Sequence, residues 1–297
     1  MAATPAAHTA TPTSTAVFPV AHFDLRATLC SGQAFRWQPT DLGWTSVIGS
    51  HFVRLRADQF SITADTALPV VDWSWLRAYL QLDLDIADVL RTFPDDEPMR
   101  IAVAACRGLR LLRQDPWECL ASFLLSSTKQ IVQIQQIVGL VCERFGEPVA
   151  VLPGLPAAYA FPTASRLARA TEAELRACKM GFRAPYLLAT ASRIAGGQFD
   201  LAGLGNLPVE VARGELMTLP GVGRKIADCV LLFAYGFRSA FPVDVWVMKA
   251  LRQLYFPRRR VSMQRMHRFA STHFGPWAGY AQQYLFHYMR TCRPEKK

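Results

Sequence analysis

The sequence lacks the patterns of several large protein classes. Its seven cysteines are odd in number and never spaced as CxxC, and no stretch approaches the roughly 18 to 20 apolar residues of a membrane span. The first basic residue is Arg26, so we expect neither a secretory signal nor an Arg-rich transit peptide. We therefore expect an intracellular protein with reduced thiols and no membrane association. We also expect a monomer, in the cytoplasm or nucleoid of a prokaryote or the nucleus of a eukaryote. Neither a metal ion nor a cofactor is predicted.

Acidic residues are scarce toward the C-terminus. From Arg252 to Lys297 there are ten Lys or Arg residues and one acid, Glu295, and the whole chain carries a formal net charge of +10. Such a segment favours a polyanionic partner, most commonly nucleic acid, although a solvated tail that aids solubility would look the same. The composition, 51% hydrophobic and 19% charged over 297 residues, indicates a globular protein with one large domain or two ordinary ones.

The order of apolar patterns predicts an α+β fold. Residues 1–15 are rich in Ala, Thr and Pro and are expected to be disordered. Short alternating runs follow at 35–37, 44–48, 52–55 and 60–62, separated by turn residues, which predicts an antiparallel meander. After about residue 72 the period becomes helical. We therefore predict a small N-terminal antiparallel β-sheet domain with flanking helices over 16–105, then an all-α domain over 106–297 with a helix-hairpin-helix at about 208–236.

Several helix boundaries are marked by individual residues. Asp115 before Pro116 opens one helix, Asp96 with Pro98 opens another, and a third runs over about 185–194 and ends at Gly196. One further helix has an apolar stripe at spacings of three and four, which we assign to the core: Ile131, Ile134, Ile137, Val138, Val141 and Phe145.

The segment LPGVGRKIADC, residues 219–229, predicts a hairpin between two helices. Proline cannot continue the first helix, while Gly221 and Gly223 accept positive φ or a close backbone approach. The free amides at the start of the second helix can donate to phosphate oxygens. The hairpin is therefore suited to a DNA backbone.

Lys225 enters the first turn of the second helix. The helix dipole, burial and the adjacent Arg224 each disfavour the ammonium form, as an amine nucleophile requires. The alternatives are a surface lysine on a phosphate or a pair with Asp228. Asp244 occupies an N-cap position, where it can serve as a structural cap and also stabilise positive charge on a sugar.

Three further residues suggest recognition of a flat base. Lys225 and Cys229 share one helix face at i, i+4 spacing, and Gln282 and Phe286 share another. A thiol and an aromatic ring could enclose a heterocycle while the amide reads its edge. On local sequence alone, ordinary core packing is the favoured interpretation of Cys229 and Phe286.

Six segments together resemble the 8-oxoguanine DNA glycosylase family, and their order and spacing match from about Leu25 to Phe286. They are SGQAFRW (31–37), GLRLLRQDPWECL (108–120), MGFRAPY (180–186), LPGVGRKIADC (219–229), PVDV (242–245) and GYAQQYLF (279–286). The hairpin and PVDV segments mark the wider helix-hairpin-helix superfamily, whereas SGQAFRW and the terminal Gln and Phe are more specific.

The resemblance implies an activity and roles for individual residues. The activity is that of a bifunctional glycosylase and lyase that excises 8-oxoguanine from double-stranded DNA in base excision repair. Lys225 matches the Schiff-base nucleophile and Asp244 the catalytic aspartate. The remaining matches are Gly32, whose carbonyl accepts the N7 hydrogen of the oxidised base, Gln282 at the base edge, Cys229 and Phe286 as the stacking pair, and Phe182 and Arg183 beside the orphaned partner base.

The chain also departs from the family pattern on the opposite-strand side. Thr128, Lys129 and Gln130 stand where better-known members have asparagines, and Gln133 stands where an arginine often contacts the opposite cytosine. Trp246 replaces a histidine that contacts phosphate. The preference for cytosine as partner is therefore open.

Three alternative functions remain open. An endonuclease III-like lyase for oxidised pyrimidines shares the lysine and aspartate, but it usually has a four-cysteine iron-sulfur motif near its C-terminus, where this chain has only Cys292. A non-catalytic helix-hairpin-helix DNA-binding protein would form no covalent intermediate. A monofunctional alkyl-base glycosylase would not ordinarily have a lysine at position 225.

Overall fold

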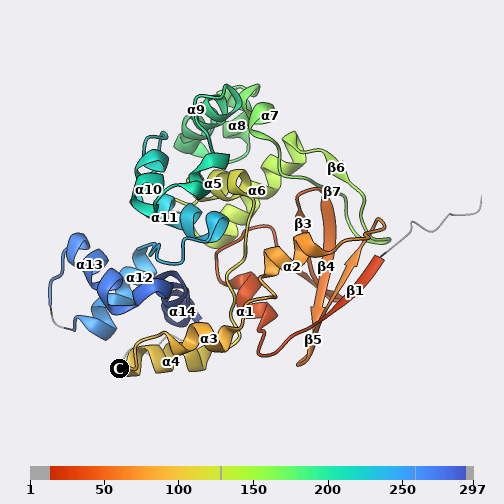
Figure 1. Cartoon of the computed structure of the whole chain (residues 1–297). Helices are drawn as coiled ribbons and strands as arrows, with labels where there is room; N and C mark the ends of the chain where they lie inside the picture. Colours follow the sequence, from red (N-terminus) through yellow and green to blue (C-terminus); the bar gives the residue numbers. More distant parts are fainter. Residues whose placement is uncertain (1–13, 128, 258, 292–297) are drawn as a thin grey trace, which may run out of the picture.

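The chain forms an antiparallel sheet joined to a larger helical body (Figure 1). A computed structural model describes residues 14–127, 129–257 and 259–291. The strands lie at one side of the molecule, and the helices that follow them in sequence surround the remaining sides. The predicted α+β class, with the sheet first and the helical region second, is confirmed.

The main sheet is an antiparallel arrangement of five strands in the order β1-β5-β4-β3-β2. The strands are β1 (Ser14–Pro19), β2 (Gln38–Thr40), β3 (Gly43–Ile48), β4 (His51–Ala57) and β5 (Ser61–Thr66). Strands β2 to β5 are neighbours in sequence and in space, as a meander requires. A separate pair of short strands, β6 (Pro148–Val149) and β7 (Ala158–Tyr159), is also antiparallel.

Two details of the predicted N-terminal region are wrong. The expected disordered segment extends too far, because Ser14 already pairs with Thr66 in the sheet. The Thr15 hydroxyl also donates to a carboxylate oxygen of Asp65 at 2.8 Å. Residues 1–13 lie outside the described part of the chain.

The second error concerns residues 35–37, which precede strand β2 and form no strand themselves. Phe35 is buried in the helical core and Trp37 in the sheet core, where its indole donates to the Tyr79 hydroxyl at 3.0 Å. The apolar run therefore connects two cores, and its pattern reflects burial without strand pairing.

The helical elements up to the hairpin lie between and after the strands. They are α1 (Leu25–Cys30), α2 (Ser74–Leu80), α3 (Ile86–Arg91), α4 (Glu97–Ala105), α5 (Pro116–Leu124), α6 (Ile131–Phe145), α7 (Ala164–Ala168), α8 (Glu172–Ala177), η1 (Gly181–Arg183), α9 (Ala184–Ala195), η2 (Ala202–Asn206) and α10 (Val209–Met217). The elements after the hairpin complete the body. They are α11 (Arg224–Val230), η3 (Leu231–Tyr235), α12 (Val245–Ala250), η4 (Leu251–Tyr255), α13 (Met263–His273), η5 (Gly275–Trp277) and α14 (Ala278–Thr291).

The predicted helix starts are confirmed by their caps. Asp96 accepts a hydrogen bond from the Met99 amide at 2.8 Å, and Asp115 accepts one from the Glu118 amide at 2.9 Å. Each side chain satisfies an amide that has no partner within its own helix. The predicted helix at 185–194 corresponds to α9, and the predicted helix-hairpin-helix range contains α10 and α11.

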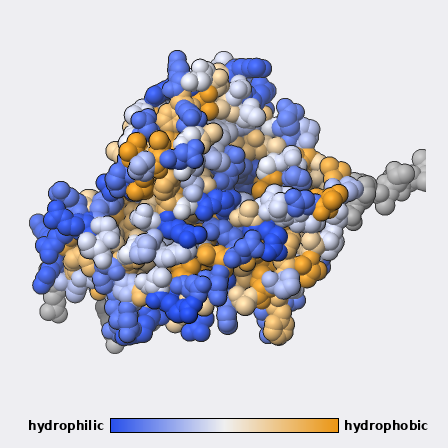
Figure 2. Space-filling model, in the orientation of Figure 1, coloured by the Kyte–Doolittle hydropathy of each residue, from blue (hydrophilic) through white to orange (hydrophobic). Residues whose placement is uncertain are grey.

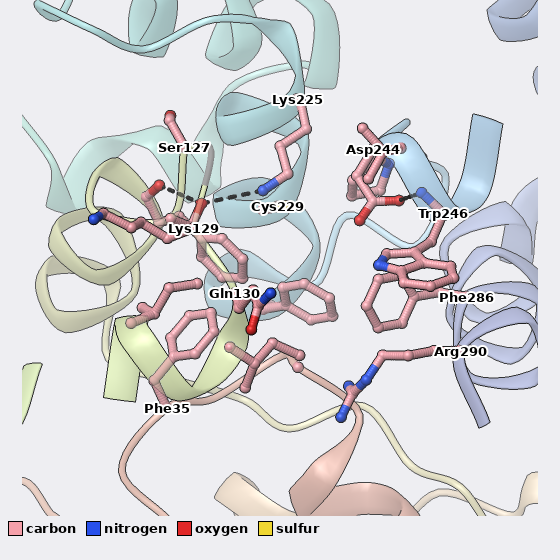
Figure 3. A pocket seen from close by; sticks show the side chains of 18 of the residues that line it. Phe35, Ser127, Lys129, Gln130, Lys225, Cys229, Asp244, Trp246, Phe286 and Arg290 are labelled. Atoms are coloured by element: carbon pink, nitrogen blue, oxygen red, sulfur yellow. Dashed lines mark hydrogen bonds between the residues drawn. The ribbon is translucent and has the colours of Figure 1, made fainter. Parts of the chain in front are cut away.

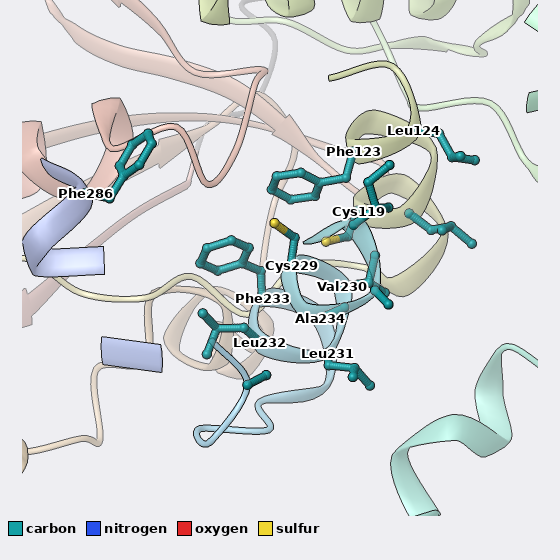
Figure 4. Packing of buried hydrophobic residues seen from close by; sticks show 14 of the residues in the cluster. Cys119, Phe123, Leu124, Cys229, Val230, Leu231, Leu232, Phe233, Ala234 and Phe286 are labelled. Carbon is teal, nitrogen blue, oxygen red and sulfur yellow. The ribbon is translucent and has the colours of Figure 1, made fainter. Parts of the chain in front are cut away.

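The largest buried cluster lies in the helical body and includes the predicted stripe of α6, of which Ile131 is only partly buried. Figure 4 shows how Cys119 and Phe123 of α5 pack beside Cys229 of α11 and Phe233. Helices α3 and α4 also contribute to this cluster, with Ile86, Val89, Met99 and Ala102. The sheet has a core of its own. The predicted domain boundary near residue 105 stays a prediction.

Polar side chains dominate parts of the outer surface. Figure 2 shows them over α13, at the left of the view, and across the middle of the molecule. Within residues 14–127, 129–257 and 259–291, the longest apolar helical segments fall short of what a membrane crossing requires.

Candidate active site

A pocket of about 720 Å³ brings together most of the residues predicted from sequence (Figure 3). It lies between the hairpin helix α11, the start of α12, helix α14 and the connection from α5 to α6. The predicted residues that line it are Gly32, Lys225, Cys229, Asp244, Trp246, Gln282 and Phe286. They come from four separate parts of the chain, so the pocket exists only in the folded protein.

The hairpin directs Lys225 into this pocket. Gly221 has a φ of +77°, and a Cβ added there would lie 2.8 Å from a ring carbon of Tyr186. Gly223 is the N-cap residue of α11, which places Lys225 in the first turn. The Lys225 amine donates to the Ser126 hydroxyl at 3.2 Å and lies 5.2 Å from the centre of the Phe123 ring. The amine therefore projects away from its own helix.

The alternative pairing of Lys225 with Asp228 is wrong. Asp228 is buried, and its carboxylate accepts from Arg213 Nε at 2.6 Å and lies 3.7 Å from Arg224 Nε. Arg213 also forms an ion pair with Glu210. Asp228 thus faces the body of the domain, while Lys225 faces the pocket.

Asp244 caps α12 and faces Lys225 across the pocket (Figure 3). One carboxylate oxygen accepts from the amides of Trp246 at 3.0 Å and Val247 at 2.8 Å. Burial raises the pKa of Asp244 above its ordinary value, and Lys225 opposes this shift. Both roles considered from the sequence, cap and charged pocket residue, are therefore compatible with the geometry.

The pocket also offers a polar group, the Gln282 amide, together with the thiol of Cys229 and the ring of Phe286. Gln282 is buried, and its Oε1 has no hydrogen-bond partner in the part of the chain that the structure describes. Burial raises the pKa of Cys229 to about 12, so the thiol stays neutral. Phe286 lies across the open space from Cys229 (Figure 4). This is a suitable arrangement for a planar ligand that pairs with the Gln282 amide.

Gly32 lines the pocket beside Ile131 and Phe286. Its φ is +73°, and an added Cβ would lie 2.7 Å from Ile131 Cδ1 and 3.4 Å from the Phe286 ring. The position therefore needs glycine for its conformation and tolerates little added volume.

The residues predicted to read the DNA outside the pocket lie apart from it. Phe182 is 56% exposed, whereas Arg183 behind it is 3% exposed, with its guanidinium carbon 4.3 Å from the centre of the Phe182 ring. Phe182 also packs edge-on against Tyr186. Phe182 is therefore accessible to DNA, while Arg183 must change conformation to reach a partner base. Both roles stay predictions.

The positions that depart from the family pattern differ in their surroundings. Gln133 is exposed, and its side-chain oxygen accepts from the Gln130 amide at 3.1 Å at the start of α6. Trp246 lines the pocket, with Lys249 Nζ 5.6 Å from the centre of its indole. Thr128 lies outside the described residues.

Sequence reasoning missed several residues that line the pocket. They are Phe35, Phe123, Ser126, Ser127, Ile131, Phe233, Gln283 and Arg290. Arg290 could have been found, because it follows Phe286 by one helical turn, as Phe286 follows Gln282. Ser126 had no comparable signal, since its relation to Lys225 is created by the fold.

The structure describes six of the seven cysteines, all with free thiols, and Cys292 lies outside the described residues. Across residues 14–127, 129–257 and 259–291, no three His, Cys, Asp or Glu side chains group closely enough to hold a metal ion.

Comparison with known proteins identifies the family. Residues 16–120 match the 8-oxoguanine DNA glycosylase N-terminal domain, and residues 121–272 match the HhH-GPD superfamily base excision DNA repair protein. The N-glycosylase/DNA lyase OGG1 of Arabidopsis thaliana is 32% identical, over 88% of this chain and 76% of its own length. A probable N-glycosylase/DNA lyase of Methanothermobacter thermautotrophicus is also 32% identical, over 92% of this chain and 95% of its own length.

Solved structures agree with this result. The crystal structure of the Clostridium acetobutylicum 8-oxoguanine glycosylase/lyase, in complex with double-stranded DNA containing cytosine opposite 8-oxoG, has a TM-score of 0.86 and 32% identity to this chain. The match covers 91% of this chain and 93% of that one. The protein therefore belongs to the 8-oxoguanine DNA glycosylase family, within the HhH-GPD superfamily of base excision repair proteins.

Proposed function

We propose that this protein is a bifunctional DNA glycosylase and AP lyase that excises 8-oxoguanine from duplex DNA. The observation that carries the proposal is that one pocket is lined by Lys225 and Asp244 together with Gly32 and Gln282. The pocket thus contains a nucleophile, a counter-charge and groups that can read the edge of a base.

Base excision begins at the sugar. Lys225 attacks C1′ with the lone pair of its amine, and the bond from C1′ to N9 of the base breaks, so the base departs with the bonding electrons and is then protonated. Positive charge develops on the sugar ring in the transition state. The Asp244 carboxylate stabilises that charge, and its backbone bonds hold it in place.

Strand cleavage follows from the same covalent bond. The bond from C1′ to the ring oxygen breaks, the oxygen takes a proton and the lysine nitrogen loses one, so a protonated Schiff base forms between Lys225 and C1′. The Schiff base acidifies C2′, a proton leaves that carbon, and the bond from C3′ to the 3′ phosphate oxygen breaks in a β-elimination. Hydrolysis of the Schiff base restores the lysine.

Base selection uses Gly32, Gln282, Cys229 and Phe286. Oxidised guanine has a hydrogen on N7, which the Gly32 carbonyl can accept, whereas ordinary guanine has a lone pair there and would meet that carbonyl as a second acceptor. The buried Gln282 amide reads the base edge, while Cys229 and Phe286 enclose the ring.

The surrounding surface engages the duplex. The hairpin amides at Gly221 and Gly223 contact phosphates, and the exposed Phe182 enters the space left by the flipped nucleotide. We further propose that the protein acts as an intracellular monomer. Its preference for the base opposite the lesion depends on Gln133 and Arg183.

Borohydride trapping tests the proposal directly. Duplexes carrying 8-oxoguanine opposite each of the four bases are incubated with the protein and reductant, and the covalent adduct is measured. Wild type should form the adduct and Lys225→Gln should not, while the exposed Lys179→Gln serves as a matched control. Lys129→Gln, at the second lysine of the pocket, tests which amine reacts.

The outcomes separate the alternatives. A parallel duplex carries an oxidised pyrimidine, and an adduct with that duplex but none with 8-oxoguanine would favour an endonuclease III-like lyase. Base release without an adduct would favour a monofunctional glycosylase. Binding without either reaction would identify a non-catalytic DNA-binding protein. An undiminished adduct with Lys225→Gln would contradict the assigned nucleophile.

A further inference from the structure

The turn that contains Gly32 is fixed by hydrogen bonds to the carbonyls on either side of it. Arg290 donates to the Cys30 carbonyl at 3.0 Å, and Gln283 donates to the Ser31 carbonyl at 2.8 Å. Gln114 donates to the Gln33 carbonyl at 2.7 Å. The Gly32 carbonyl, in contrast, accepts no hydrogen bond from any residue that the structure describes. Of four consecutive carbonyls, three are therefore held and one is left for a ligand.

Two of these three donors come from helix α14, which also carries the base-reading side chains. Gln283 follows Gln282 and is 2% exposed, and Arg290 follows Phe286 by one turn. The Arg290 guanidinium also lies 6.0 Å from the centre of the Phe286 ring. Helix α14 thus carries the Gln282 amide and the Phe286 ring and also holds the turn that contains Gly32, so it fixes the three relative to one another.

The direction of the Gly32 carbonyl needs to be fixed by other residues. Gly32 has a φ of +73° and no side chain, so its own conformational preferences do little to fix the direction of its carbonyl. A hydrogen bond weakens steeply when its angle is poor. A carbonyl that distinguishes N7–H from a bare N7 must therefore be aimed by its neighbours.

We infer that Gln283 and Arg290 are positioning residues that aim the Gly32 carbonyl and thereby set the discrimination between 8-oxoguanine and guanine. The inference rests on the proposed function. Neither side chain needs to touch the lesion, because each acts through the carbonyl that it holds. Their loss should weaken recognition of the base without affecting the chemistry of Lys225.

This separation gives a selective test, because an abasic site has no base for Gly32 to read. Gln283→Glu keeps the side-chain size but removes the amide donor, and Arg290→Met keeps much of the length but removes the guanidinium. Arg290→Lys retains one donor group. Matched controls are Gln136→Glu and Arg100→Met, both at exposed positions outside the pocket.

Two single-turnover rates are measured for each protein, excision of 8-oxoguanine and cleavage at a preformed abasic site, both opposite cytosine. We expect Gln283→Glu and Arg290→Met each to lower excision about tenfold, as for the loss of a bond to a well-placed recognition group. Cleavage at the abasic site should change by less than about twofold on the same argument. Arg290→Lys should fall between wild type and Arg290→Met.

A second readout is the ratio of dissociation constants for guanine and 8-oxoguanine duplexes, measured in the Lys225→Gln background. Gln283→Glu and Arg290→Met should each lower this ratio. An equal loss of both cleavage rates, or an unchanged ratio, would overturn the positioning role. The proposed function fails by a different result, namely a wild-type protein that cleaves abasic sites but does not excise 8-oxoguanine. Failure of the positioning role and failure of the proposed function are therefore distinguishable.

Discussion

The Lys225 amine donates a 3.2 Å hydrogen bond to the hydroxyl of Ser126, a residue 99 positions earlier in the chain. The same hydroxyl donates to the Phe123 carbonyl at 2.7 Å, so it is itself held by the end of α5. This contact joins the hairpin helix to the opposite wall of the pocket. It gives the long lysine side chain one preferred direction before DNA arrives.

Replacement of Ser126 by Ala should therefore slow the reaction without abolishing it. The amine keeps its place in α11 but loses an oriented partner, which we expect to cost about 1 kcal/mol, or about fivefold in the rate of adduct formation. Single-turnover borohydride trapping measures this rate, with the exposed Ser192→Ala as the control. A rate equal to wild type would show that the hydroxyl does not orient the nucleophile.

The sequence predicted those parts of the site that depend on local patterns. The glycine hairpin indicates where Lys225 enters its helix, and the cap position indicates where Asp244 begins the next one. Ser126 could not be predicted, because its partner lies on another element and no spacing links them. Arg183 shows another way in which a prediction from sequence is incomplete. Its motif suggests contact with DNA, but tertiary packing buries the side chain behind Phe182.

Asp244→Asn should separate the cap from the charge. An asparagine oxygen can still accept from the amides of Trp246 and Val247, so the unfolding free energy should stay within about 1 kcal/mol of wild type. The charge that stabilises the sugar cation is lost, and we expect base excision to fall by about 10²- to 10³-fold. Urea unfolding and single-turnover excision measure the two effects. A parallel loss of stability and activity would mean that Asp244 is mainly a cap.

The same residue should determine the acidic side of the pH profile. Burial raises the pKa of Asp244 above the ordinary 3.8, and the ionised form is the one that stabilises the cation. Excision should therefore increase with pH through that raised value, so the rise in rate should occur above pH 3.8. This rise should be absent in Asp244→Asn when rates are measured across the acidic range. Its persistence in the variant would assign it to another group.

Gly221→Ala should disturb the hairpin. The residue has a φ of +77°, and the new methyl group would lie 2.8 Å from the Tyr186 ring. We expect a loss of about 1 to 2 kcal/mol in stability from the strained backbone. DNA binding should also weaken, because the amides that face the phosphates move. Gly214→Ala, in α10 where an added Cβ has open space, is the control. Equal affinity of the two variants for duplex DNA would contradict this role of the hairpin.

The buried pair of Arg213 and Asp228 involves no contact with Lys225 and should make a large contribution to stability. Arg213→Met leaves the Asp228 carboxylate buried with only the more distant Arg224, and we expect a loss of about 3 kcal/mol in unfolding free energy at pH 7. Burial raises the pKa of Asp228. The folded variant therefore binds a proton more readily than the unfolded chain, so its stability should increase as the pH falls from 7 to 5.

The double variant Arg213→Met, Asp228→Leu removes both charges and should recover part of the lost stability, because no buried charge is left without its partner. Urea unfolding of the three proteins at pH 5 and pH 7 checks both statements. The ion pair would be of little consequence if Arg213→Met unfolded at the same urea concentration as wild type. If instead the double variant were less stable than the single one, the loss would come from packing around the side chains and not from the isolated carboxylate.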